Sequence, residues 1–287
     1  MKKLYILTLL LIWTFTLSAQ TNNYIEYYRN IEKGILKGVF EENNDTTIYY
    51  FNYAFEKAEA YPEDLLIISK VYYDNKNNNK AFEYLIKSLE NGIDTAAITN
   101  IGISSLLNHQ QKELLIEKYN NYKIEYDTVL LNQLDSIIEL DQYVREFDWN
   151  DTASVTYQSS LNKMSLQDSL NRIWILNTIK EKGWMGRKLI GNDGTSFLLL
   201  LHIHTSWINT NFEILEKEIL KGNLNPSYLA ATLDRPFFIN GNLKYRSFLP
   251  GNFNTPKDTE EMKTNRYKIG ALSSNVFLYR SKFKHRY

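Results

Sequence analysis

Apolar residues recur at intervals of three and four along most of the chain, the spacing that places them on one face of an α-helix. In residues 62–92, small or apolar side chains keep this spacing on both sides of a polar turn. They are Leu65, Ser69, Tyr72, Ala81, Leu85 and Ser88. The pattern predicts two antiparallel helices joined by a turn, because short connections join antiparallel neighbours in helical proteins.

The predicted hairpin at residues 62–92 resembles a tetratricopeptide repeat, whose signature positions fall at similar intervals within a unit of about 34 residues. Ala54 and Ala58 fit the end of a preceding unit, and residues 98–119 fit a degenerate following unit. An unrelated pair of antiparallel helices would give the same pattern, since a repeat array needs about three units to bury a continuous core. In the repeat interpretation, residues 20–126 form a helical-repeat domain with a concave binding surface.

A second region begins near Asp127 with another helical stripe. Its apolar members are Leu130, Leu134, Ile137, Ile138 and Val144. Asp141 lies on the same stripe and Arg145 follows four residues later, so the two side chains can meet on one side of the helix. The pair is either an exposed ion pair or part of a polar pocket. We predict that residues 127–287 form a mostly helical C-terminal domain.

Residues 150–163 have no apolar period and are predicted to be a loop. Ser165 then has the position of a helix N-cap, with Asp168 three residues later as in a capping box. The helix that it begins is expected to end at Gly183. Glycines are frequent from Gly183 onwards, but their spacing matches neither phosphate-binding glycine pattern, which argues against nucleotide binding.

Two of the four histidines, His202 and His204, end the apolar run L-L-L-L-H-I-H. In a strand they would project from the same face and could share a metal ion, whereas in a helix they diverge by about 200°. Apolar residues downstream continue at helical spacing, which favours the helix. The chain has no cysteine and its other histidines are distant in sequence, so donors for a metal centre are scarce. We therefore expect no metal and no cofactor.

The pair Asn240-Gly241, between apolar and aromatic flanks, is the strongest signal for a β-hairpin in the chain. Asp258 and Thr259 then begin a predicted helix that ends at Gly270. The expected fold class is mainly α. It comprises N-terminal helical hairpins of tetratricopeptide-like type, followed by a mostly helical C-terminal domain with one small β-hairpin.

Residues 1–19 have the layout of a secretory signal peptide. Two lysines precede an apolar stretch from Leu4 to Phe15, and Ser18 and Ala19 offer a cleavage site. The alternative is a membrane anchor, but the stretch is shorter than the ~20 residues that a spanning helix needs. We expect cleavage after Ala19, no transmembrane segment in the mature protein, and a periplasmic or secreted location.

Composition narrows the possible partners. The chain has 33 basic and 33 acidic residues, so no overall electrostatic field marks nucleic acid as a partner. The absence of cysteine excludes disulfides, a thiolate nucleophile and cysteine-ligated zinc. With 287 residues, 44% of them hydrophobic, the chain can bury a full core and is long enough for two domains.

From about Leu134 to its C-terminus the chain resembles a bacterial domain family of unknown function. The motifs of that family read D-Q-x-x-R, D-x-x-N, G-W, Q-H-[SA]-D, D-R and Y-G-[ST]-Q. This sequence matches them, in order, at Asp141, Gln142 and Arg145, at Asp168 and Asn171, at Gly183 and Trp184, at His204, at Asp234 and Arg235, and at Tyr245 and Ser247. The resemblance implies that His204, rather than His202, has the histidine position of the family. It implies no particular reaction.

The chain departs from the family motifs around this histidine and in the last motif. Ile203 and Ser206 stand where the family has glutamine and aspartate, and Arg246 and Phe248 stand where it has glycine and glutamine. A histidine, two aspartates and two arginines that converge could serve as general base, orienting acid and anion clamp. The departures favour a different interpretation, in which His204 and the aspartates are satisfied polar residues that hold helices together.

Two classes of function follow. The first is an exported interaction protein whose helical repeats bind a protein or peptide and not nucleic acid; the second is a periplasmic enzyme, most plausibly a hydrolase. The candidate catalytic residues are His204, Asp141 and Asp234, and the candidate binding residues are Gln142, Arg145, Asn171, Trp184, Arg235 and Tyr245. The missing polar neighbours of the histidine favour the interaction protein, whereas convergence of these side chains around an open pocket would favour the enzyme.

Overall fold

The computed structural model describes residues 23–93, 95–100, 107–121, 125–147, 150, 152–237, 243–247 and 258–283. Within these residues the chain is mainly helical and contains no β-strand. Its α-helices are α2 (Tyr24–Gly34), α3 (Asn44–Lys57), α4 (Pro62–Asp74), α5 (Asn78–Glu90), α6 (Thr95–Asn100), α7 (His109–Asn121), α8 (Thr128–Tyr143), α9 (Val155–Lys182), α10 (Arg187–Ile190), α11 (Gly194–His202), α12 (Thr205–Thr210), α13 (Phe212–Leu220), α14 (Pro226–Asp234), α15 (Glu260–Ile269) and α16 (Ser274–Ser281). A π-helical turn, η1 (Ile35–Val39), and a 3-10 turn, η3 (Arg235–Phe237), complete the set. The predicted signal peptide lies outside the described residues.

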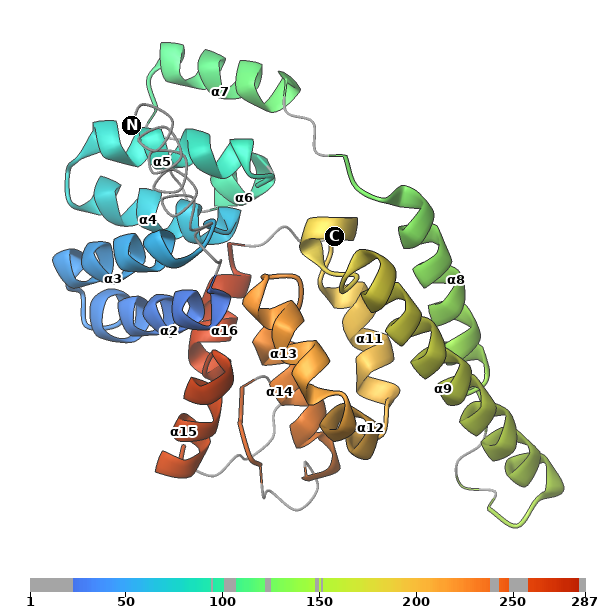
Figure 1. The fold of residues 1–287 in the computed structure, drawn as a ribbon. Coiled ribbons are helices and arrows are strands. Elements are labelled where there is room, and N and C mark those ends of the chain that lie inside the picture. Colours follow the sequence, from blue (N-terminus) through green and yellow to red (C-terminus); the bar gives the residue numbers. More distant parts are fainter. Residues whose placement is uncertain are drawn as a thin grey trace, which may run out of the picture.

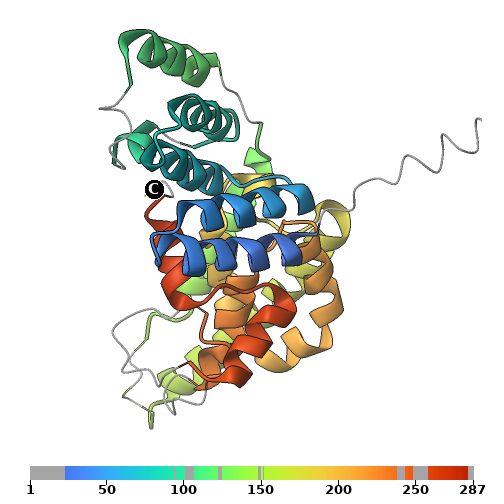
Figure 2. The ribbon, with the colours of Figure 1, turned by 90° about the vertical axis from the view of Figure 1, so that its left-hand side faces the viewer.

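The first four helices form two antiparallel pairs that are stacked on each other (Figures 1 and 2). In the first pair, α2 and its π-helical extension approach α3 closely because two glycines face it. A Cβ atom at Gly38 would lie 2.0 Å from the Thr47 hydroxyl oxygen, and one at Gly34 would lie 2.7 Å from the Phe51 ring. Only glycine therefore fits at these crossings without displacement of α3.

The second pair, α4 and α5, is the helix hairpin that the apolar spacing predicts. Ala81, Leu85 and Ser88 are all buried. Two hydroxyl groups tie the pair together: Ser69 Oγ donates to the Ala81 carbonyl oxygen (2.7 Å) and Ser88 Oγ donates to the Pro62 carbonyl oxygen (2.9 Å). The small residues at these positions let the two helices approach closely enough for side chain to backbone bonds.

Two apolar cores hold the described residues together. The first lies among the N-terminal helices and also includes Val276 and Phe277 of the C-terminal helix α16. The second is formed mainly by residues of the helices from α8 to α14, and it includes Ile25 of α2. The C-terminal helices α15 and α16 accordingly lie against the N-terminal helices (Figures 1 and 2). The expected boundary at residue 127 lies between α7 and α8, but both cores draw residues from both sides of it.

Helix α9 begins ten residues earlier than its expected start at Ser165, and the predicted loop at residues 150–163 is wrong for Val155 onwards. Ser154 is the N-cap, since its side chain accepts a hydrogen bond from the Tyr157 backbone N–H (3.0 Å). The first turns of α9 extend beyond the end of α8 (Figure 1), and a helix with little to pack against needs no apolar stripe. The end at Gly183, with φ of 93°, agrees with the prediction.

In the C-terminal region, α15 confirms the predicted helix between Thr259, its N-cap, and Gly270, its left-handed C-cap. The predicted β-hairpin is not supported: residues 243–247, which would supply its second strand, are not in strand conformation, and Asn240-Gly241 lies outside the described residues. The helices of the described part of the chain include none with the length and apolar character to cross a membrane.

Candidate functional site

The packing of α8 against α9 brings a buried carboxylate to the centre of a polar cluster. Asp141 on α8 is fully buried, and its Oδ1 accepts a hydrogen bond from Asn171 Nδ2 on α9 (2.9 Å). Arg145, in the turn that follows α8, donates through Nη2 to the same oxygen (3.0 Å) and also pairs with Asp168 on α9. Arg145 thus links two carboxylates, and the predicted pair of Asp141 and Arg145 is part of a buried network rather than an exposed ion pair.

Helix α11 adds a histidine to this network. His202 is the last residue of α11, and its Nδ1 lies 2.5 Å from Asp141 Oδ2 and 3.0 Å from Arg145 Nε. One nitrogen cannot both donate to a carboxylate and accept from a guanidinium, and the shorter contact with a buried carboxylate favours a proton on Nδ1. This tautomer leaves Nε2 as the basic atom of the ring, and Nε2 makes no hydrogen bond to a described residue.

We call Asp141, Arg145, Asp168, Asn171 and His202 the His202 cluster. Its members are buried or half-buried and come from α8 and the turn after it, from α9 and from α11. Two glutamines support it from its edge: Gln142 Nε2 donates to Asp141 Oδ2 (3.1 Å) and Gln167 Nε2 donates to Asn171 Oδ1 (2.8 Å). Both oxygens of the central carboxylate are therefore satisfied by side chains, as a buried charge requires.

Arg235, another candidate binding residue, begins the turn η3 that follows α14, and its side chain is exposed. Burial of its guanidinium, together with the positive charge of Arg145, lowers the pKa of Arg235, whereas the charges of Asp168 and Asp141 raise it. Arg235 forms neither a hydrogen bond nor an ion pair with any residue that the structure describes.

His204 does not belong to the cluster, which corrects the expectation that it, rather than His202, has the inner position. Helix α11 is helical as predicted but ends at His202, and Ile203 is extended and buried. His204 is exposed and caps α12, because its Nδ1 accepts from the Ser206 backbone N–H (3.2 Å). The predicted divergence of the two rings along one helix does not apply, since the helix stops between them.

Asp234 also lies outside the His202 cluster and binds backbone N–H groups of a turn. Its buried carboxylate accepts backbone N–H groups from Lys244 (2.6 Å), Tyr245 (2.9 Å) and Arg246 (2.6 Å). Burial raises the pKa of Asp234, and these three hydrogen bonds act in the opposite direction. Arg246 has a φ of 49°, in the left-handed region, so Asp234 holds a strained turn in place. Its role is structural.

Trp184 and Tyr245, two of the candidate binding residues, are core residues. The side chains of both are almost completely buried in the second core. The Trp184 backbone N–H donates to Glu218 Oε2 (2.8 Å), and the Tyr245 backbone is held by Asp234. The predicted site residues that come together are thus Asp141, Gln142, Arg145 and Asn171.

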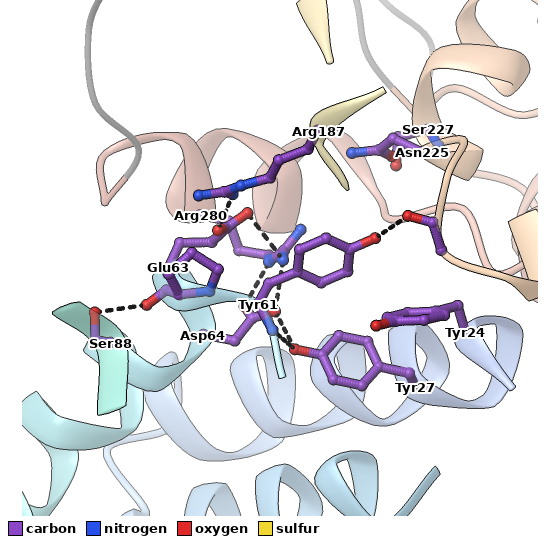
Figure 3. Close-up of polar contacts among 12 residues, drawn as sticks. Tyr24, Tyr27, Tyr61, Glu63, Asp64, Ser88, Arg187, Asn225, Ser227 and Arg280 are labelled. Carbon is purple, nitrogen blue, oxygen red and sulfur yellow. Dashed lines mark hydrogen bonds and ion pairs between the residues drawn. The ribbon is translucent and has the colours of Figure 1, made fainter. Parts of the chain in front are cut away.

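A second polar network, which sequence analysis did not find, joins the N-terminal and C-terminal helices (Figure 3). Arg280 of α16 donates through Nε to Asp64 Oδ1 (2.7 Å) and through Nη2 to Asp64 Oδ2 (2.5 Å), and the Tyr27 hydroxyl donates to Asp64 Oδ2 (2.6 Å). Glu63 pairs with Arg280 (3.4 Å) and with Arg187. Arg280, Asp64 and Glu63 are almost completely buried, so the network is an internal link between α4, α16 and α10.

A pocket of about 440 Å³ lies beside this network, at the junction of the N-terminal hairpins with the rest of the chain. We call it the junction pocket. Its lining residues are Tyr24, Glu59, Ala60, Tyr61, Pro62, Glu90, Asn91, Tyr126, Arg187 and Lys188. The Tyr24 hydroxyl donates to the Glu59 carbonyl oxygen (2.9 Å), and the Tyr61 hydroxyl donates to the Gly222 carbonyl oxygen (2.8 Å). Arg187 belongs both to the pocket wall and to the buried network.

Lys188 supplies a cation at the wall of the junction pocket. Its Nζ donates to the Lys221 carbonyl oxygen (3.1 Å) and lies 4.5 Å from the centre of the Tyr24 ring. Burial lowers the pKa of Lys188, and the charge of Glu59 raises it. The lining of the pocket therefore combines aromatic residues with both signs of charge.

The His202 cluster and the junction pocket differ in the chemistry that they allow. In the His202 cluster, a neutral ring oriented by a carboxylate could take up a proton at Nε2, or could bind an anion once protonated. The junction pocket has no such pair and is suited to binding alone. Among the described residues, no group of three or more His, Asp or Glu side chains is placed to hold a metal ion. No protein-family model, curated protein or solved structure matches the chain.

Proposed function

We propose that the protein is an exported interaction protein that binds a segment of a protein or peptide in the junction pocket. The observation that carries the proposal is the pocket itself, whose walls come from the N-terminal hairpins, from Tyr126 and from α10. Export is inferred from the signal-like residues 1–19.

The lining of the junction pocket supports a peptide as the ligand. Tyr24, Tyr61 and Tyr126 line the pocket; Tyr24 and Tyr61 are almost completely buried in the first core, and Tyr126 is half-buried. Tyrosine combines a large contact area with a polar tip, which is why it is frequent in protein interfaces. Glu59 and Lys188, which form a long ion pair with each other (4.0 Å), add opposite charges that can pair with side chains or termini of a peptide. A volume of about 440 Å³ accommodates a few side chains.

The buried network beside the pocket supports a preformed site. Arg187 is held by Glu63, which also contacts Arg280, so one wall of the pocket is fixed by ion pairs that are largely buried. A wall that is already ordered loses less conformational entropy when a ligand binds.

The proposal is tested with the mature chain, residues 20–287, and a display library of random peptides. Peptides selected on the wild-type protein are then measured by calorimetry against Lys188→Glu, and against Lys263→Glu as a control on the exposed face of α15. We expect Lys188→Glu to weaken binding at least tenfold and Lys263→Glu to leave it unchanged. The proposal fails if the library yields no binder, or if the selected peptides bind both variants equally.

A second candidate function is a periplasmic hydrolase, and the contact between Asp141 and His202 favours it. A histidine oriented by a buried carboxylate is a common general base, with the carboxylate holding the ring in the reactive tautomer. A panel of chromogenic phosphate and carboxylate esters tests this function. Activity that His202→Gln abolishes and His204→Gln preserves would establish the enzyme, whereas activity that survives His202→Gln would eliminate it.

A further inference from the structure

Helices α8 and α9 expose large apolar side chains along their outer side. Within each helix these side chains are spaced three, four or eleven residues apart, which places them on one stripe. We call them together the α8–α9 face. Its members are Val129, Leu140 and Tyr143 of α8 and Leu166, Leu170 and Ile173 of α9, with exposed fractions between 51% and 72%. Single exposed apolar residues are ordinary, but a group of them on two neighbouring helices marks an interaction surface.

The two stripes lie on the same side of the helix pair. α8 and α9 are antiparallel neighbours (Figure 1), and the last residue of α9 donates a hydrogen bond to the N-cap of α8 (2.6 Å). Asp141 and Asn171 point toward each other across the pair (2.9 Å). Leu140 and Leu170 each precede one of these residues, so each is turned by about 100° from the contact. In two right-handed antiparallel helices this turn leads to the same side. The second core lies on the other side, so the α8–α9 face is left to solvent.

The first half of α9 has no buried side chain. The helix has 28 residues, but its buried residues begin only at Asn171. Most of the stability of a helix in a protein comes from packing of one face, because helix propensity alone is barely sufficient. Leu166 and Leu170 lie in this first half. The part of α9 that the chain itself does not cover therefore presents apolar side chains to a partner.

The exposed charges of the two helices are complementary. α8 exposes two acids, Asp135 and Glu139, whereas α9 exposes three lysines and one acid. Two of the lysines, Lys163 and Lys180, have no ion-pair partner among the described residues, and neither do the two acids. An acidic helix attracts a basic one, so α8 of one copy of the chain fits α9 of another better than it fits α8. In a two-fold symmetric pair this contact occurs twice.

We propose that the α8–α9 face joins two copies of the chain into a dimer, with α8 of each copy against α9 of the other. The same face is buried on both copies, as two-fold symmetry requires. The apolar side chains of the face expose on the order of 100 Å² each, or roughly 600 Å² per copy, whereas a stable interface buries about 800 Å² per partner. The polar residues around the face supply the remainder. The junction pocket is lined by other residues, so the dimer does not depend on the function proposed for that pocket.

A charge in the middle of the α8–α9 face tests the apolar contact. Leu170→Glu changes an exposed side chain, so the fold is expected to survive. Leu278→Glu is the matched control, because Leu278 is a leucine of another helix, α16, with the same exposed fraction of 51%. Sedimentation equilibrium of the mature chain, residues 20–287, at several protein concentrations gives the dissociation constant of the dimer. We expect Leu170→Glu to raise this constant at least tenfold and Leu278→Glu to leave it unchanged. Circular dichroism of each variant checks the fold.

Reversal of the exposed charges tests which helices meet. The first variant, Asp135→Lys with Glu139→Lys, makes both helices basic, and the second, Lys163→Glu with Lys180→Glu, makes both acidic. Each variant alone is expected to dimerise at least tenfold more weakly than the wild type, because like charges then face each other. In an equal mixture of the two variants, α8 and α9 of opposite charge face each other at both contacts. The mixture is therefore expected to form heterodimers with about the affinity of the wild type.

Three results would overturn the dimer. The first is a wild-type chain that is monomeric at every concentration; if that monomer sediments with anionic phospholipid vesicles, the face belongs to a membrane surface instead. The second is a Leu170→Glu variant that folds and dimerises like the wild type. The third is a mixture of the two charge-reversed variants that dimerises no better than either variant alone, since pairing of α8 with α9 requires the rescue.

Discussion

Asp141 Oδ2 and His202 Nδ1 lie 2.5 Å apart although 61 residues separate them in the sequence. The contact exists because α11 packs against α8, and because α11 ends with His202 facing the buried carboxylate. Asp141 is thus the residue on which the orientation of His202 and Arg145 depends. The surroundings of Asp141 suit a negative charge, because hydrogen-bond donors contact both oxygens of its carboxylate.

Replacement of the central carboxylate is expected to be costly. Asp141→Asn leaves Arg145 with one carboxylate instead of two and leaves the His202 ring against a neutral amide. Removal of one partner from a buried ion pair destabilises a protein by roughly 3 kcal/mol or more. The measurement is urea unfolding followed by circular dichroism. Asp135→Asn, an exposed aspartate on the same helix, is the control and is expected to change the free energy of unfolding by less than ~0.5 kcal/mol. Equal effects of the two variants would contradict the buried network.

The two histidines of L-H-I-H are expected to differ in the same assay. His202→Ala strips a partner from the Asp141 carboxylate, which costs about 1–3 kcal/mol when the group stays buried. His204→Ala removes only the N-cap of the short helix α12, an effect of about 1 kcal/mol or less. A larger loss of stability for His204→Ala than for His202→Ala would show that His204, and not His202, has the buried position.

His202 and His204 show what local sequence patterns do not predict. Periodicity predicts the helix that contains the leucine run, but it does not give the residue at which that helix ends. The buried, extended Ile203 decides which ring turns inward, and its burial depends on distant residues of the second core. If the family motif is placed on His202 instead, Leu201 and His204 occupy its glutamine and aspartate positions. The resemblance itself stays a hypothesis.

The ion pairs of Glu63 and Asp64 with Arg280 could not be predicted from the sequence for a related reason. Glu63 and Asp64 follow Pro62 in the first turn of a helix, where acidic residues are ordinary and usually exposed. Their partner Arg280 is more than 200 residues away, as the separation of 216 between Asp64 and Arg280 shows. The amphipathic hairpins and the α15 boundaries were predictable because spacing and caps are local. The exposed start of α9 was missed because an unpacked helix carries no apolar period.

Overpacking of the α4–α5 hairpin tests the helix contact that apolar spacing predicted. Ala81→Trp inserts a large ring where Ser69 Oγ reaches the Ala81 carbonyl oxygen, and such insertions typically cost about 1–3 kcal/mol. The control is Lys80→Trp, since the side chain of Lys80 is exposed on the same helix. Chemical denaturation of both variants gives the comparison, and an unchanged midpoint for Ala81→Trp would show that Ala81 is not at the helix interface.

Glu218 gives the fold a predictable dependence on pH. Burial on its own raises the pKa of this carboxyl, but hydrogen bonds from Asn223, Lys221 and the Trp184 backbone N–H lower the pKa below its ordinary value. The distances of these bonds are 2.8 Å, 2.6 Å and 2.8 Å. Because the carboxylate is favoured in the folded state, it adds stability above the ordinary glutamate pKa of about 4.3, and this stability is lost as pH falls through the lower folded pKa.

Glu218→Gln should therefore destabilise the protein at pH 7, by roughly 1–3 kcal/mol for the loss of charged hydrogen bonds to a buried acceptor. The deficit should shrink as the pH falls below about 4, where the wild-type carboxyl also becomes protonated. Glu213→Gln, an exposed glutamate on the same helix α13, is the matched control and should not show this convergence. Urea unfolding of the three proteins between pH 3 and pH 7 measures the effect. A deficit of Glu218→Gln that stays constant over this range would show that the charge of Glu218 does not hold the loop around Trp184.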